Sequence, residues 1–166
     1  MEAHRCIMAI DPDSDKSGLA VLDVTARQFV SLCTLSFPEL ICSIRQFAAK
    51  APVPVKVYVE AGWMCPSNWH ITSKFSRQKC AAMGVDVGRN QETGRKIIEM
   101  LTHYGIAVSP VRPLIKVWGK HGHEKISHAE LSAFAPVGKR TNQEERDAAL
   151  LAWDKAGLPM VVPVRK

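Results

Sequence analysis

Long hydrophobic runs are missing from the sequence, and this limits the classes of protein to which it can belong. No apolar stretch approaches the roughly 20 residues that a membrane-spanning helix needs. The first residues lead straight into a strand-like segment and lack the apolar region and cleavage site of a signal peptide. Low-complexity tracts and internal repeats are missing too. We therefore expect a soluble, cytoplasmic protein with no membrane partner, folded as one domain over residues 1–166.

A disulfide framework is also missing. The five cysteines are an odd number, and three of them stand within apolar runs, where a free thiol packs as a small hydrophobe. This pattern favours a reducing compartment. Cys65, His70 and Cys80 could be considered as metal ligands, but their spacing matches none of the usual zinc patterns, and a structural zinc site needs a fourth ligand.

Acidic residues are fewer than basic ones. Lys and Arg number 22 against 16 Asp and Glu, which gives a net charge of +6 and a pI near 9.2. A basic surplus suits a polyanionic partner such as a nucleic acid, although many basic proteins bind none. Charge alone therefore decides nothing, and the placement of the acids becomes the more informative feature.

The hydrophobic pattern up to residue 60 predicts three strands, a helix and a fourth strand. The helix carries apolar residues at helical spacing from Pro38 until just before Pro52. Short polar connectors predict antiparallel pairing of the first three strands, whereas the helical crossover predicts that the fourth strand is parallel to the first. The expected strands are residues 5–10, 18–23, 29–35 and 55–60.

The second half is expected to add one more strand and further helices. In order, we expect mostly loop with a short helix over 61–92, a helix through 97–104, a strand at 106–110, a basic connection at 116–125, a short helix up to 134 and a last helix over 142–156. The fold class is therefore α/β, with a mixed central sheet of three antiparallel strands plus parallel strands and helices on both faces. This is the element order of the ribonuclease H-like fold.

Acidic residues stand at the ends of two neighbouring parallel strands and in the last helix. Asp11 follows the first strand and Glu60 closes the fourth, and the carboxyl ends of parallel strands are where α/β sheets place their ligands. Glu144 and Asp147 are three residues apart in the last helix and so project from one face. Apolar residues after them would pack the helix on the sheet and direct both acids at its rim.

A carboxylate cluster of this kind suits phosphodiester hydrolysis. The reaction needs an activated water and stabilisation of charge on the phosphorus and on the leaving oxygen, which two divalent cations about 3.5–4 Å apart can supply. Magnesium prefers oxygen ligands, so the protein must present several carboxylates. The sequence therefore predicts a magnesium-dependent hydrolase.

Each acid also has an ordinary structural explanation. Asp11 before Pro12 could end a strand in an Asx turn, and Glu60 could be a solvated residue at a strand end. Residues 141–144 match a capping box in which Glu144 reaches back to a backbone N–H. No single acid identifies a catalytic site, so the hypothesis depends on their joint placement.

Motifs along nearly the whole chain resemble those of the RuvC family of Holliday junction resolvases. Each motif alone is weakly specific, but their order, spacing and total length agree with that family. The second contains an aromatic residue three positions after its Glu, and the third resembles a glycine-bearing helix start. The motifs are Ile7–Val21, Val57–Trp63, Gly88–Gly94, Pro110–Lys125 and Glu144–Ala152.

This resemblance implies an endonuclease that cleaves four-way (Holliday) junctions or related branched DNA in recombination or repair. It implies a homodimer as well, because a two-fold junction needs two symmetric nicks, with the helix through 97–104 as the implied dimer surface. It implies Mg²⁺, or Mn²⁺ in its place, bound by the catalytic acids Asp11, Glu60, Glu144 and Asp147.

The resemblance also implies residues that contact DNA. Trp63 would stack on an opened base near the branch point, or else be an ordinary core tryptophan. Lys116 and Lys125 would contact phosphate near the scissile bond, or else belong to a solvated loop. Apart from the resemblance, the basic character of residues 61–92 leads us to expect further DNA-binding cations at Lys74, Arg77 and Arg89.

The sequence departs from the family pattern at three places. Asp13 stands where the family usually has Gly, so the turn after Asp11 carries an extra charge. Glu144 replaces the more common Asp and is one methylene longer. The stretch 64–83 is longer than its family counterpart, and its basic residues suggest a substrate-contacting loop.

Three alternatives to a nuclease share some of these residues. An EF-hand starting at Asp11 is rejected, because its sixth and twelfth positions are Lys16 and Leu22 rather than Gly and Glu. The pair Asp11 and Asp13 resembles haloacid dehalogenase phosphatases, but Asp15 stands where that family has Thr or Val. A RuvC-like module that binds branched DNA without cleaving it is the remaining alternative.

Overall fold

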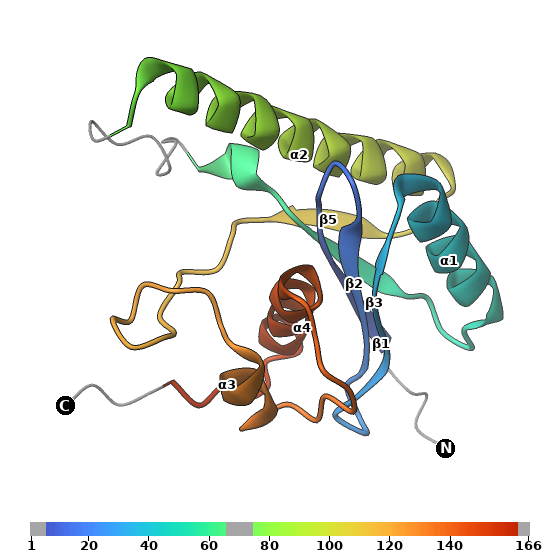
Figure 1. The fold of residues 1–166 in the computed structure, drawn as a ribbon. Coiled ribbons are helices and arrows are strands. Elements are labelled where there is room, and N and C mark those ends of the chain that lie inside the picture. The colour runs from blue at the N-terminus through green and yellow to red at the C-terminus, as the bar shows by residue number, and fades with distance from the viewer. Residues whose placement is uncertain (1–5, 66–74, 163–166) are drawn as a thin grey trace.

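The computed structural model describes residues 6–65 and 75–162 (Figure 1). Its elements follow the predicted order of strands and helices. They are β1 (Cys6–Asp11), β2 (Ser17–Asp23), β3 (Gln28–Leu35), α1 (Phe37–Lys50), β4 (Lys56–Glu60), the 3-10 turn η1 (Gly62–Met64), α2 (Arg77–His103), β5 (Val108–Val111), α3 (His128–Ser132) and α4 (Gln143–Lys155).

The strands form one mixed sheet in the order β3-β2-β1-β4-β5. β1 to β3 are antiparallel neighbours, while β4 pairs parallel with both β1 and β5. The antiparallel part follows from the short connectors, and the parallel part from the α1 and α2 crossovers. The predicted fold class is confirmed.

Helices cover both faces of this sheet, and each face has its own apolar core. Met8 and Ile10 of β1 face α1 and α2, whereas Ala9 between them faces α3 and α4. In Figure 1, α1 and α2 lie on one side of the strands and α3 and α4 on the other. Side chains alternate along a strand, so a residue's position in its strand determines which helices it meets.

The sequence prediction for residues 61–92 is wrong in one main respect. α2 begins at Arg77, where the Ser76 hydroxyl caps the Lys79 N–H at 3.2 Å, and it continues without a break to His103. The Gly88–Gly94 motif therefore lies inside a helix rather than at its start. The first part of α2 is largely exposed, so it shows no apolar stripe from which its length could be predicted.

The later part of α2 packs in the core of this same chain. Ile97 and Leu101 are both fully buried against the sheet. They are therefore not available to the dimer surface that was expected on the helix through 97–104. The homodimer itself stays a prediction.

Two expectations concern features that the sequence lacks. All five cysteines are free thiols, as expected. Among the helices formed by residues 6–65 and 75–162, none has the length and apolar character needed to cross a membrane.

Candidate active site

Asp11 and Glu60 lie side by side on one face of the sheet. β1 and β4 are parallel with Ile10 opposite Val59, so the next residue of each strand is one of these two acids. Ile10 and Val59 both point into the α1 and α2 core. Because side chains alternate, Asp11 and Glu60 point to the opposite face, which is covered by α4.

Gly18 allows α4 to approach these acids closely. It lies directly opposite Asp11 in the β1–β2 ladder. A Cβ at Gly18 would overlap the backbone carbonyl of Glu144, so only glycine permits this contact between sheet and helix. The first turn of α4 is thereby held next to the end of β1.

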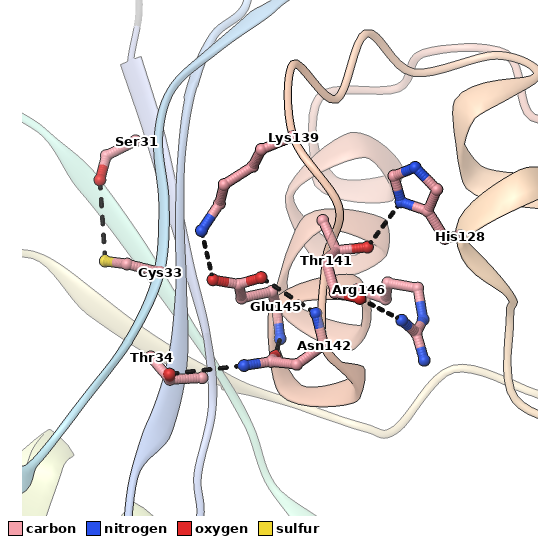
Figure 2. A network of polar contacts seen from close by, with 9 residues as sticks. All are labelled: Ser31, Cys33, Thr34, His128, Lys139, Thr141, Asn142, Glu145 and Arg146. Carbon is pink, nitrogen blue, oxygen red and sulfur yellow. Dashed lines mark hydrogen bonds and ion pairs between the residues drawn. The ribbon is translucent and has the colours of Figure 1, made fainter.

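The N-terminus of α4 is fixed by a capping box one residue later than the sequence suggested. Asn142 is the N-cap, its side chain accepts from the Glu145 N–H at 2.9 Å, and Glu145 accepts from the Asn142 N–H at 3.0 Å. Figure 2 shows Glu145 also bound by Lys139, at 2.7 Å. The expectation that Glu144 could serve as the capping acid is therefore wrong, and its carboxylate is not used in the cap.

Burial and neighbouring carboxylates raise the pKa of Asp11 well above its usual range. After burial, the largest causes are the negative charges of Glu60 and Asp147. Glu144 raises the pKa of Asp11 by a smaller amount, whereas the positive charge of Lys125 lowers it. All four predicted metal-binding acids therefore share one electrostatic site, because like charges at short range disfavour ionisation.

Glu60 responds in the same way. Burial first, and then Asp147, raise the pKa of Glu60 from 4.5 to about 7. Lys125 and Lys116 oppose this rise. These are the two lysines for which the resemblance implies a phosphate contact, and both lie within electrostatic reach of the acids.

The carboxylate of Asp147 is held on both oxygens. Lys125 Nζ donates to Oδ2 at 2.5 Å, and Gln143 Nε2 donates to Oδ1 at 2.8 Å. Arg146 in turn donates to the Gln143 side-chain oxygen at 2.9 Å and to the Thr141 carbonyl. Gln143 was not singled out from the sequence, although its place four residues before Asp147 on a helix is the available signal.

The chemistry of this donor set fits a divalent cation. All four side chains offer only oxygens, which Mg²⁺ prefers, and their mutual repulsion is what a cation would relieve. Within residues 6–65 and 75–162, however, no three His, Cys, Asp or Glu side chains form a ready-made ligand group. Lys125 and Gln143 each use one lone pair of an Asp147 oxygen, so an ion would have to share these oxygens with the two donors or displace one of them.

Asp13, the acid that the family pattern does not contain, has a structural role. Its Oδ1 accepts from the Asp15 N–H at 2.8 Å, and its Oδ2 accepts from the Asn90 side chain at 3.1 Å. Asn90 also accepts from the Ser14 N–H at 2.9 Å. The turn after Asp11 is therefore tied to α2, and Asp13 is not among the groups that shift the pKa of Asp11.

Trp63 packs between the site and α2. A Cβ at Gly94 of α2 would lie 2.8 Å from the Trp63 ring and 3.2 Å from Pro12. The Arg95 guanidinium lies over the same ring, 5.1 Å from its centre. Trp63 is thus half-buried next to the turn after Asp11. It packs against α2 and at the same time lies beside the acids.

The other predicted DNA-binding cations are not part of this cluster. Arg89 is exposed on α2 and pairs with Asp86 at 3.9 Å, and Arg77 is exposed at the start of the same helix. Neither is among the groups that shift the pKa of Asp11 or Glu60. Lys74 lies outside the described residues.

Comparisons with known proteins identify the fold. No protein-family model and no curated protein matches this sequence. A solved structure of T. thermophilus RuvC in complex with a Holliday junction substrate is 15% identical, covers 93% of this chain and 97% of its own, and superposes with a TM-score of 0.52. A second Thermus thermophilus RuvC structure is 13% identical over 92% of this chain and 96% of its own, with a TM-score of 0.44. The resemblance to RuvC is confirmed at the level of the ribonuclease H-like fold.

Proposed function

We propose that this protein is a Mg²⁺-dependent endonuclease that cleaves four-way junctions or related branched DNA. The observation that carries the proposal is that Asp11 and Glu60, at the ends of two paired parallel strands, lie next to the N-terminal part of α4, which carries Glu144 and Asp147. The fold of a RuvC protein whose structure includes a Holliday junction supports the choice of substrate.

The roles of the residues follow from their positions. The four carboxylates would hold divalent ions, which when bound supply an activated water and neutralise charge at the phosphorus. Gln143 orients Asp147, and Gly18 holds the first turn of α4 against the sheet. Lys116 and Lys125 are exposed and would draw the phosphate backbone towards the acids.

A homodimer is part of the proposal. Two equivalent sites related by a two-fold axis suit two symmetric nicks across a junction. Mn²⁺ is expected to replace Mg²⁺, because both are hard ions with a preference for oxygen ligands.

The direct test is a panel of labelled DNAs, including a four-way junction, a flap, a fork and the matching linear duplex. Each is incubated with the purified protein in Mg²⁺, in Mn²⁺ and in EDTA. We expect metal-dependent cuts near the branch, on opposing strands of the four-way junction, and little cutting of the duplex. Equal cutting of duplex and junction would contradict the substrate assignment.

A branched-DNA-binding module without cleavage is the main alternative. The Lys125–Asp147 ion pair favours it, because the Lys125 ammonium lies next to an oxygen that a metal would use and would repel a cation there. The same panel separates the two, since binding without cuts in either metal would support the module. The phosphatase alternative is disfavoured, because Asp13 is bound to Asn90 and to turn backbone instead of lying free beside Asp11.

A further inference from the structure

Ile115 is the most exposed large hydrophobic residue of the part of the chain that the structure describes. Its exposed fraction is 80%. Single exposed hydrophobics are ordinary on protein surfaces, so exposure alone assigns no role. The next residue, however, is Lys116, which opposes the rise in the pKa of Glu60 and so lies within reach of the carboxylates. Ile115 is therefore displayed beside the candidate active site.

Its neighbours hold Ile115 in this exposed position. Leu114 and Val117 pack against the core between the sheet and α4, and Trp118 is only 2% exposed. Ile115 and Lys116 are the two exposed residues between Leu114 and Val117. Because the side chain is branched at Cβ, it has few rotamers to lose when it is inserted elsewhere.

The segment that carries Ile115 starts at the same sheet edge as the acids. The Ala61 N–H donates to the Val111 carbonyl at 2.8 Å, which ties the exit of β4 to the exit of β5. Figure 1 shows the chain after β5 leaving this edge and passing beside α4. Ile115 follows Val111 by four residues, and exposed Arg112 and Lys116 flank it at short range.

We propose that Ile115 is an apolar wedge that enters the base stack next to the branch and helps this protein to distinguish branched DNA from linear duplex. The inference rests on the proposed function and adds a specificity-determining residue to it. Ile, Leu and Met side chains open base steps in other DNA-binding proteins. Opening is least costly where stacking is already interrupted, as it is at a branch. Arg112 and Lys116 would bind the phosphates on either side.

Three variants test this role. Ile115→Gln removes the apolar side chain while keeping its approximate size, and Ile115→Leu restores apolar character. Val30→Gln is the matched control, because Val30 is also branched at Cβ and is 58% exposed, but lies on β3 at the far edge of the sheet. Ile115 buries little surface, so the melting temperature of Ile115→Gln should equal that of the wild type.

The readout is the fluorescence of 2-aminopurine placed at the branch of a four-way junction, measured in EDTA, with parallel titrations of junction and linear duplex. Wild type, Ile115→Leu and Val30→Gln should raise the fluorescence on binding, because opened bases lose their stacking. Ile115→Gln should lose most of this rise. Because Ile115→Gln cannot hold a base step open at the branch, its ratio of junction affinity to duplex affinity should fall by roughly tenfold.

The outcomes separate the wedge from the proposed function. Junction-selective binding with an unchanged fluorescence rise in Ile115→Gln would overturn the wedge and leave the proposed function standing. An equal loss of junction and duplex affinity would also overturn it, since that is a general contact. A wild-type protein that binds no branched DNA would overturn both.

Discussion

Gly18 and the backbone carbonyl of Glu144 lie so close that no side chain fits between β2 and α4. This contact places the first turn of α4 next to Asp11, the ladder partner of Gly18. The geometry of the carboxylate cluster therefore depends on a residue that carries no functional group.

We predict that Gly18→Ala lowers the free energy of unfolding by about 1–3 kcal/mol, the usual cost of overpacking. Urea unfolding measures it. Metal-dependent cleavage should fall as well, because α4 must move away from the sheet. Gly88→Ala in α2 is the control, since a Cβ there meets no atom within 4 Å, and it should leave stability unchanged or raise it. Equal effects of the two substitutions would argue against the close approach.

Lys125 and a metal ion would compete for Asp147. Removing the ammonium that lies 2.5 Å from Oδ2 should therefore increase the affinity for Mn²⁺. Calorimetry on Lys125→Ala without DNA measures this affinity, and Lys155→Ala, whose partner is Asp154, is the control. Cleavage by Lys125→Ala should nevertheless fall, since a phosphate contact is lost. A weaker affinity for Mn²⁺ in Lys125→Ala would contradict this account of the ion pair.

The metal-free protein should lose stability as the pH rises. The pKa of Glu60 is raised from 4.5 to about 7 on folding, so below pH 4.5 the group is protonated in both states. Between pH 4.5 and about pH 7, Glu60 ionises in the unfolded chain but keeps its proton in the folded state, so the free energy of unfolding decreases as the pH rises. Urea unfolding in EDTA at pH 5 and pH 8 measures the decrease. The decrease should be smaller in Glu60→Gln. An identical decrease in that variant would show that the raised pKa of Glu60 is not its cause.

Asp13 should matter for stability rather than for metal binding. Asp13→Ala removes the acceptor of the Asp15 N–H and of Asn90, and each lost hydrogen bond costs about 0.5–1.5 kcal/mol. The melting temperature should therefore fall, while the number of Mn²⁺ ions bound stays that of the wild type. Loss of a bound ion on this substitution would make Asp13 a ligand.

Local patterns in the sequence predict most of the sheet and the first pair of acids. Alternating apolar residues define β4, and a helical crossover makes it parallel to β1, which is enough to bring Asp11 and Glu60 together. Glu144 and Asp147 are three residues apart on a helix, and this spacing alone predicts that they project from the same face. These features depend on residues close together in the chain.

The remaining features depend on contacts between distant residues or on exposed surface. The partner of Asp13 is Asn90, and no local pattern indicates a contact across 77 positions. The first part of α2 is exposed, with Val85 at 54%, so it lacks the apolar stripe that reveals a helix. Thr141 and Asn142 are both good N-caps, and the choice of Asn142 decides that Glu145, and not Glu144, completes the cap.

Cleavage of a four-way junction by Asp147→Asn tests the central claim most directly. Asp154→Asn, which removes an acid near the other end of α4, is the matched control. We predict that Asp147→Asn nicks the junction in Mg²⁺ more than about a hundredfold more slowly than the wild type, a loss beyond that usual for partners of metal ligands, and that it still binds the junction. Asp154→Asn should cleave normally. Cleavage by Asp147→Asn at the wild-type rate would contradict the carboxylate site.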